Sequence, residues 1–347
     1  MSRSLSNSTA PEITFPAIEP IAEPIDRPFW SVMITSYNRT EYLEQCIKSV
    51  LAEGFSPEEM QIEVVDDHST KADIEKIVES VAPGQVSFYR QPKNVGIYEN
   101  WNTCIRRARG YWIHILSDDD QILPGFYEAY RQQIKQHSCL VVAGQSVFFN
   151  EKSQWTGVSP AIQNYSGLID DAKLIFAMGN PIRTPGIIVA REAYKEVGGF
   201  TSDLVYTPDW EMWSRLATYV KVGYVNRPFS LFREHSNSET SRLAHAGNSV
   251  SDALRATEII QSRFADPETR QLIQASVRQY LCNSCQTLSG IFVGEGNYQA
   301  ALSQATLAMQ VKLSFYSAKN FLSVLVKISI SFLRSKAKRR GGGCGYV

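Results

Sequence analysis

The sequence predicts an α/β protein whose mostly parallel central sheet has helices on both faces and is followed by a C-terminal helical extension. Three observations lead to this expectation. Apolar runs alternate with amphipathic helical segments and short loops from residue 30 to residue 149, which is typical of strands paired in parallel. Polar residues gather directly after three of the expected strands. From about residue 250 the apolar spacing is helical almost to the end, which predicts the extension.

Strands and helices are expected to alternate through the first half of the chain. The expected strands are residues 30–35, 62–65, 86–89, 111–116 and 140–142. Helices are expected around residues 42–51, 74–81 and 101–108, and again after Pro124. Asn38 and Glu41 have the spacing of a capping box, so Asn38 is expected to cap the first helix.

The pattern becomes less regular beyond residue 150. A helix is expected over 171–178, with strands over 186–190 and 222–225 and then a polar loop from Arg233 to Ser241. One face of a further helix is expected to carry Trp210, Trp213, Leu216 and Ala217. We therefore expect four parts: a disordered lead-in (1–28), an α/β domain (29–245), a helical region (246–335) and a basic, Gly-rich flexible tail (336–347).

The composition excludes several classes of protein. Lys plus Arg and Asp plus Glu are both 35, so the net charge of zero gives no electrostatic case for nucleic acid. Residues 1–29 lack the apolar core of a signal peptide, and no run reaches the ~18 apolar residues of a membrane span. Cys282 and Cys285 have no second pair at zinc spacing and are expected to pack within a helix. With no disulfide framework, a reducing cytoplasm is the expected compartment.

The local feature that most needs an explanation is the acidic triplet Asp118–Asp120, which follows the apolar run 111–116 and Ser117. Adjacent carboxylates raise one another's pKa unless a positive group binds them. Mg²⁺ and Mn²⁺ prefer oxygen ligands and often share them with substrate phosphates. Ligands of open α/β sheets bind beyond the carboxyl ends of the strands. The triplet therefore indicates a metal site for a phosphorylated ligand, and an acidic turn closed by Pro124-Gly125 is the alternative.

Two more polar clusters follow expected strands, at residues 35–38 and 66–69. Because parallel strands end at one edge of a sheet, these clusters should converge on the acidic triplet. An aromatic ring beside carboxylates suits a nucleotide: the ring flanks the base, and a carboxylate accepts from a base N–H or a ribose hydroxyl.

Taken together, six motifs resemble glycosyltransferase family 2 in their order and spacing. The motifs are SVMITSYNR, EVVDDHS, NVGIYENWN, GYWIHILSDDDQILPG, PDWEMWSRL and FREHSNSET. They cover roughly residues 30–240. The resemblance implies the GT-A fold with its Rossmann-like sheet, and inverting transfer of a sugar from a nucleotide-diphosphate sugar. It also implies UDP as the expected nucleotide, Mn²⁺ or Mg²⁺ as cofactor, and a hydroxyl of a glycan, lipid-linked or other molecule as acceptor.

The resemblance implies a set of donor-binding residues. Thr35 and Tyr37 would contact the nucleotide base, with Asp67 accepting from its imide N–H. Asn94 and Asn100 would lie near the base or the ribose. The full set that the resemblance implies is Thr35, Tyr37, Asn38, Asp67, Asn94, Asn100 and Asp118.

The resemblance also implies the metal ligands. Asp119 would bind the metal that contacts the diphosphate, and His235 would be a further ligand, with a surface-loop histidine as the alternative. Asp118 would face the ribose or the sugar, and Asp120 would support either neighbour. Ser117 departs from the family pattern, because many members carry Asp at this position.

Asp209 falls on the position of the catalytic base, and Glu211 is the second choice. The base is needed because a sugar hydroxyl is a poor nucleophile until a carboxylate takes its proton. Pro208 replaces the Glu that usually precedes this Asp. The alternative for Asp209 is a charge that merely favours the N-terminus of a helix.

Two other functions remain open at this point. A nucleotidyltransferase would need a Gly-rich loop after the first strand to stabilise attack on a phosphate, and the loop over residues 36–39 has no glycine. A non-catalytic protein that binds sugar nucleotides would have lost the base, whereas Asp209 is present.

The C-terminal segment is strongly basic. No Asp or Glu follows Glu295, whereas eight cations do: Lys312, Lys319, Lys327, Arg334, Lys336, Lys338, Arg339 and Arg340. Such a segment suits peripheral contact with an anionic membrane at its inner face, where lipid-linked acceptors reside. The alternative is a terminal helix that covers the core. We expect the acceptor to bind residues 150–185 and the C-terminal helices.

Overall fold

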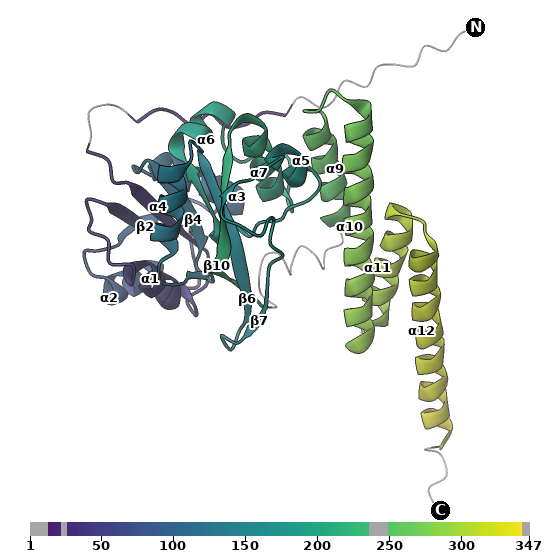
Figure 1. Cartoon of the computed structure of the whole chain (residues 1–347). Coiled ribbons are helices and arrows are strands. Elements are labelled where there is room, and N and C mark those ends of the chain that lie inside the picture. The colour runs from purple at the N-terminus through teal and green to yellow at the C-terminus, as the bar shows by residue number, and fades with distance from the viewer. Residues whose placement is uncertain (1–12, 22–25, 236–248, 342–347) are drawn as a thin grey trace, which may run out of the picture.

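The computed structural model describes residues 13–21, 26–235 and 249–341, with side chains described up to residue 331. An α/β domain built on a central sheet occupies the first two-thirds of the chain, as Figure 1 shows, and four C-terminal helices lie on one side of it. These helices are α9 (Ser249–Gln261), α10 (Pro267–Gly294), α11 (Tyr298–Val311) and α12 (Phe315–Gly341).

Ten strands of the described chain form one sheet in the order β3-β2-β1-β4-β9-β6-β10-β5, with β7 paired to β6 and β8 to β10. Their bounds are β1 Trp30–Ser36, β2 Met60–Asp66, β3 Ser87–Arg90, β4 Trp112–Ser117, β5 Gln121–Ile122, β6 Val141–Asn150, β7 Trp155–Val158, β8 Gly167–Leu168, β9 Ile187–Ala190 and β10 Val222–Glu234. Neighbours among β3, β2, β1 and β4 are parallel, as are β6 and β10. Strand β9 joins these two groups and is antiparallel to both β4 and β6.

Helices cover both faces of the sheet, so the predicted fold class is confirmed. The remaining helices are α1 Leu43–Leu51, α2 Ile74–Val81, α3 Ile97–Arg107, α4 Phe126–Gln136, α5 Ala172–Ala177, α6 Arg191–Val197 and α7 Pro208–Tyr219, with a short 3₁₀ helix η1 over Thr184–Gly186. Ile47 and Tyr127 belong to the core on the face covered by α1, α2 and α4. Trp101 and Trp213 belong to the core on the opposite face, where α3, α6 and α7 pack. Strands β1 and β2 are buried along their whole length, as expected for parallel strands covered on both faces.

The C-terminal helices share a core with the α/β domain. Trp210 of α7 packs in one apolar cluster with Ile260 at the end of α9 and Val277 of α10. The indole N–H of Trp210 also donates to the backbone oxygen of Phe176 at 2.7 Å. This cluster fixes α9 and α10 against the helix that carries Asp209.

Asn38 does not cap α1, so this expectation is wrong. The N-cap of α1 is Tyr42, which makes no side-chain capping bond. Asn38 has a φ of 52°, and its Oδ1 accepts from the backbone N–H groups of Thr70 and Lys71 at 2.8 and 2.9 Å. Asn38 is therefore used to join the loops that follow β1 and β2.

Several expected boundaries are also wrong. Residues 13–21 of the expected lead-in pack on the α/β domain: Ile18 is 5% exposed, and the Pro16 oxygen accepts from the Gly199 N–H at 2.7 Å. Strand β10 continues to Glu234, so Arg233 lies in a strand and not in a polar loop. Helix α12 reaches Gly341, beyond the expected boundary at residue 335. Residues 236–241 of the expected polar loop and residues 342–347 of the tail lie outside the described chain.

Candidate active site

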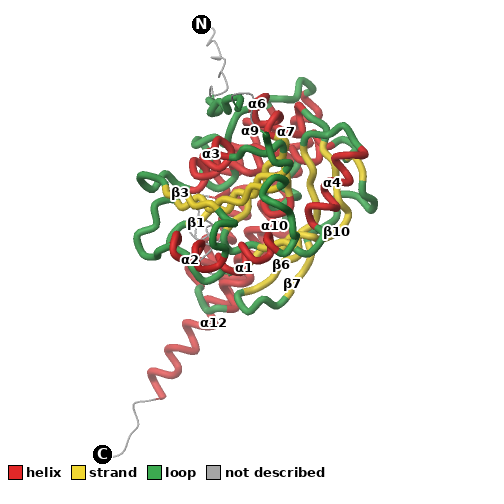
Figure 2. Tube along the Cα trace, turned by 90° about the vertical axis from the view of Figure 1, so that its left-hand side faces the viewer, coloured by secondary structure: helices red, strands yellow, loops and turns green. Residues whose placement is uncertain are grey.

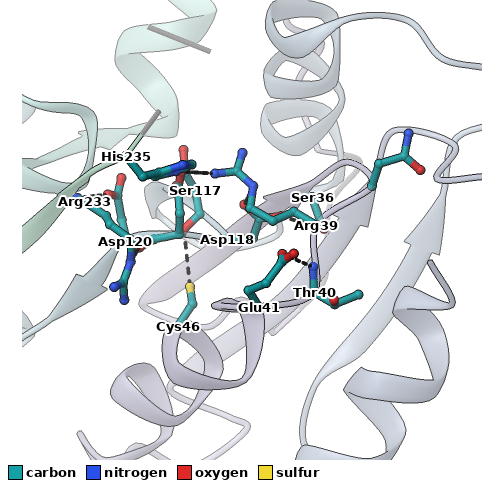
Figure 3. Close-up of polar contacts among 12 residues, drawn as sticks. Ser36, Arg39, Thr40, Glu41, Cys46, Ser117, Asp118, Asp120, Arg233 and His235 are labelled. Atoms are coloured by element: carbon teal, nitrogen blue, oxygen red, sulfur yellow. Dashed lines mark hydrogen bonds and ion pairs between the residues drawn. The ribbon is translucent and has the colours of Figure 1, made fainter. Parts of the chain in front are cut away.

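The three polar clusters meet at the carboxyl edge of the parallel strands. The N–H of Asp67 donates to the Ser36 oxygen at 2.8 Å, and the N–H of Asp118 donates to the Thr35 oxygen at 3.1 Å. The loops that follow β1, β2 and β4 are thereby held side by side. Figure 3 shows side chains of the loops after β1 and β4 together with Arg233 and His235.

The three carboxylates of the acidic triplet have different partners. Asp118 accepts from the Ser36 hydroxyl at 2.8 Å and lies 3.3 Å from Arg39 Nε. Asp120 accepts from the backbone N–H of Arg233 at 2.9 Å. Burial raises the pKa of Asp118 to about 7 and raises the pKa of Asp120 well above its ordinary value. A positive charge placed beside these two carboxyl groups would therefore stabilise their ionised forms.

Asp119 is the carboxylate that faces His235. Its Oδ2 lies 2.9 Å from His235 Nε2 and also accepts from Arg39 Nη1. Burial acts to raise the pKa of Asp119, but the hydrogen bond with His235 and the charge of Arg39 bring that pKa below its ordinary value. Asp119 is therefore the member of the triplet that stays ionised most readily.

Arg39 is a site residue that the sequence analysis missed. Its guanidinium spans Asp118 and Asp119, and its Nη1 lies 3.0 Å from His235 Nε2. Figure 3 draws the contact between Arg39 and His235. The available signal was its position, since it is a cation in the loop after β1, at the same sheet edge as the triplet. Arg233, by contrast, is buried, and its guanidinium packs over the rings of Tyr42 and Phe149.

The carboxylate of Asp67 organises the loop before α3. It accepts from the backbone N–H groups of Val95 and Gly96 at 2.7 and 2.9 Å, and from Asn94 Nδ2 at 3.0 Å. Burial raises the pKa of Asp67, and the backbone N–H bonds from Val95 and Gly96 only partly offset this. Tyr37, in the neighbouring loop, is 48% exposed and open to a ligand.

Asn100 lies inside the protein, apart from this open edge. It is 2% exposed, its Nδ2 donates to the Val65 oxygen at 3.0 Å, and its Oδ1 accepts from Gln91 at 3.1 Å. One end of the amide therefore ties α3 to β2 and the other ties it to Gln91, the residue after β3, so Asn100 has a structural role.

A cavity of about 310 Å³ opens beside the acidic triplet and holds Asp209 in its wall. The α/β domain contributes charged and aromatic groups to it, and α9 and α10 contribute Ala253, Val277, Tyr280 and Leu281. Lining residues that the sequence analysis did not name include Asn180, Arg183 and Tyr206. The cavity thus lies between the α/β domain and the C-terminal helices.

Asp209 stands in the first turn of α7 with its carboxylate in the cavity. Asn180 Nδ2 donates to its Oδ2 at 2.8 Å. Burial raises the pKa of Asp209, and the backbone N–H of Trp210 and the charge of Arg183 only partly offset this. A carboxylate with a raised pKa is a better proton acceptor than an ordinary one.

Glu211, the second choice for the base, does not line the cavity, and the structure gives it another role. It is fully buried and forms ion pairs with Arg215 of the same helix and with Arg263, which follows α9. Glu211 therefore joins α7 to the C-terminal helical region.

We expect Glu211→Ala to lower the free energy of unfolding by about 3–5 kcal/mol, because it leaves the buried Arg215 without its partner. Urea denaturation of the whole chain measures this effect. The matched control is Glu192→Ala, which breaks an exposed pair with Lys195 and should leave the midpoint almost unchanged. Equal midpoints for the two variants would contradict a structural role for Glu211.

A second link holds the chain just before Asp209. The carboxylate of Asp252, on α9, accepts from the backbone N–H groups of Val205, Tyr206 and Thr207, each at 2.9 Å. It also accepts from the Thr207 hydroxyl at 2.8 Å. Helix α9 therefore fixes the loop that leads into α7, and with it the place of Asp209.

The central, mostly parallel sheet with helices around it has the GT-A fold of known glycosyltransferase structures. Residues 31–198 match the family model described as glycosyl transferase family 2, and the chain carries a domain of that family. The chain is therefore a transferase enzyme, as predicted.

Three known proteins are similar to this chain in sequence or structure, and one of the two sequence relatives is named a glycosyltransferase. An uncharacterized glycosyltransferase of Rickettsia typhi is 26% identical over 262 residues, which are 73% of this chain and 78% of the relative. An uncharacterized protein of Mycobacterium tuberculosis is 26% identical over 241 residues, 66% of this chain and 74% of that protein. The crystal structure of S. aureus TarS 1–349 in complex with UDP-GlcNAc is similar in fold, with a TM-score of 0.54 and 15% identity over 88% of this chain and 92% of that one.

Proposed function

We propose that this protein is an inverting glycosyltransferase that moves a sugar from a nucleotide-diphosphate sugar to an acceptor hydroxyl, with Asp209 as the base. The observation that carries the proposal is a single cavity lined by both Asp119 and Asp209. It offers a charged end for a diphosphate and a proton acceptor for the incoming hydroxyl.

The nucleotide is proposed to bind along the edge formed by the loops after β1 and β2. Exposed Tyr37 flanks the base, with Thr35 beneath it. Asp67 uses its remaining lone pairs to accept from a base N–H. Asn94 donates to Asp67, and Asn38 joins the loops that follow β1 and β2. We propose UDP as the nucleotide, and the UDP-GlcNAc complex of TarS, a protein of similar fold, supports this choice.

The residues at Asp119 fit a divalent cation. Asp119 Oδ2 and His235 Nε2 are 2.9 Å apart, so this oxygen and this nitrogen would both hold a divalent cation. No group of three His, Cys, Asp or Glu side chains in the described chain is arranged to hold a metal, so the other ligands would be donor phosphates and water. Charge neutralisation on the leaving diphosphate is the chemistry that bound Mn²⁺ or Mg²⁺ supplies.

Each residue around the donor has a distinct part in the proposed transfer. Asp118, held by Ser36, faces the ribose or the sugar, and Asp120 supports the loop through Arg233. Asp209 takes the proton of the acceptor hydroxyl while that oxygen forms a bond to the anomeric carbon and the bond to the diphosphate breaks. Attack from the side opposite the diphosphate inverts the anomeric configuration. The acceptor enters between the α/β domain and α10, where Tyr280 lines the cavity.

Transfer activity should fall as the pH drops through the raised pKa of Asp209. Burial disfavours the charged form, so the base is ionised only at a pH above that pKa, which lies above the ordinary value of 3.8. The acid limb of a plot of log kcat/KM against pH should therefore have its midpoint above pH 3.8. A limb centred at or below the ordinary value would contradict the assignment.

Thermal-shift measurements with a panel of nucleotide sugars, with Mn²⁺ or with EDTA, test the proposal directly. A ligand that binds only the folded state stabilises it by RT ln(1 + [L]/Kd) and so raises the melting temperature. We expect the largest shift for a UDP-sugar in Mn²⁺. If no nucleotide sugar raises the melting temperature, the proposed donor is wrong.

A further inference from the structure

Helix α12 has two faces of opposite kind. Ser317 and Val324 are buried, and Phe321 and Ile328 pack beside Val324 against α10 and α11. On the other side an outer stripe consists of Phe315, Leu322, Val326 and Ile330, which are 77%, 60%, 57% and 44% exposed. The outer stripe is the part of this amphipathic helix that nothing in the described chain covers.

The outer stripe is continuous along the helix. Its members are separated by seven, four and four residues, a spacing that keeps side chains on one face of a helix. At 100° per residue, this face lies opposite Val324. An exposed apolar face of this length differs from singly scattered surface residues and marks an interaction surface.

Basic residues accompany the outer stripe. Lys319 lies within it and Lys327 at its side, both exposed, and neither faces an acidic residue of its own segment because none follows Glu295. The sequence continues with five more cations between residues 334 and 340. Apolar side chains interleaved with lysines match the boundary between headgroups and acyl chains of an anionic bilayer.

We propose that α12 docks this protein on an anionic membrane surface, with the outer stripe lying in the interface and the lysines contacting lipid phosphates. Figures 1 and 2 show α12 extending away from the body of the protein, so it can lie on a flat surface without displacing the α/β domain. Among the described residues, no helix is long and apolar enough to cross a bilayer, which favours a helix that lies in the interface. A second copy fits less well, because stripe-to-stripe pairing would bring lysines together without any carboxylate between them.

Co-sedimentation of the full chain with vesicles tests this proposal. We expect binding to phosphatidylcholine vesicles that contain phosphatidylglycerol and at least tenfold weaker binding to pure phosphatidylcholine. Leu322→Ser with Val326→Ser should lower the partition coefficient at least about tenfold, because two buried aliphatic side chains are lost. Lys319→Gln with Lys327→Gln should weaken binding roughly tenfold and reduce its salt dependence.

The matched control is Leu272→Ser, which replaces an exposed leucine of α10 and should leave vesicle binding unchanged. Melting temperatures close to that of the parent chain show that the α12 variants remain folded. Equal binding by the parent chain and the stripe variants, or no binding to anionic vesicles, overturns the proposal. So does a dimer in light scattering that the Leu322→Ser, Val326→Ser variant converts to a monomer without any change in vesicle binding.

Discussion

Asp209→Asn should lower the rate of sugar transfer by roughly 10²–10⁴-fold while leaving donor binding intact, because an amide cannot accept the proton of the acceptor hydroxyl. The substitution preserves shape, and its Oδ1 can still accept the hydrogen bond from Asn180 Nδ2. The expected loss is therefore in kcat, with little change in the affinity for the nucleotide sugar.

Release of the nucleoside diphosphate reports transfer, and isothermal titration with the nucleotide sugar reports donor binding separately. The matched control is Asp203→Asn, which makes the same change at an exposed position on the loop ahead of α7. Near-normal turnover by Asp209→Asn would remove Asp209 from its role as base. An equal loss of donor affinity and turnover would instead place Asp209 in the donor site.

The residues at the sheet edge were predictable because they depend on local sequence. A buried apolar run followed at once by Asp118–Asp120 identifies a strand end, and parallel pairing brings strand ends to one edge. The convergence of the Thr35 and Asp67 loops follows from the same rule. No long-range information was needed beyond the order of the strands.

The cavity was not predictable in the same way, because its walls come from distant segments without a shared periodic pattern. Asn180 and Arg183 lie in an irregular stretch, and Tyr280 is one exposed residue on a long helix. Arg39 was overlooked because a single arginine in a loop has no spacing that distinguishes it. Only tertiary packing brings it to Asp119 and His235, which lie 80 and 196 residues further along the chain.

The capping of α1 shows how tertiary contacts override local sequence. Asn38 and Glu41 have the spacing of a capping box, yet Asn38 bonds to the loop after β2. The exposed backbone N–H groups of Thr70 and Lys71 bond to the Asn38 side-chain oxygen that would otherwise cap α1. By joining the loops, Asn38 contributes to the same edge that presents Tyr37 and Asp67.

Asp119→Ala should abolish the part of donor binding that depends on Mn²⁺, because it removes the carboxylate oxygen that lies 2.9 Å from His235 Nε2. His235 alone is a weak ligand for a divalent cation, and the diphosphate then lacks its charge partner. In thermal shifts with UDP-sugars, the variant should respond equally in Mn²⁺ and in EDTA. Asp203→Ala, at an exposed position, should retain the response of the parent chain.

Arg39 allows this experiment to distinguish a bound metal ion from a positive charge of the protein, because its guanidinium already bonds to the same Asp119 oxygen. If a cation binds there, Arg39 has to release that oxygen, and Arg39→Gln should strengthen the Mn²⁺ response. If the parent chain binds UDP-sugars equally in Mn²⁺ and in EDTA, Arg39 itself supplies the positive charge, and the metal assignment is wrong. In that case Arg39→Gln should weaken donor binding in both conditions, by an amount that decreases as salt screens the diphosphate.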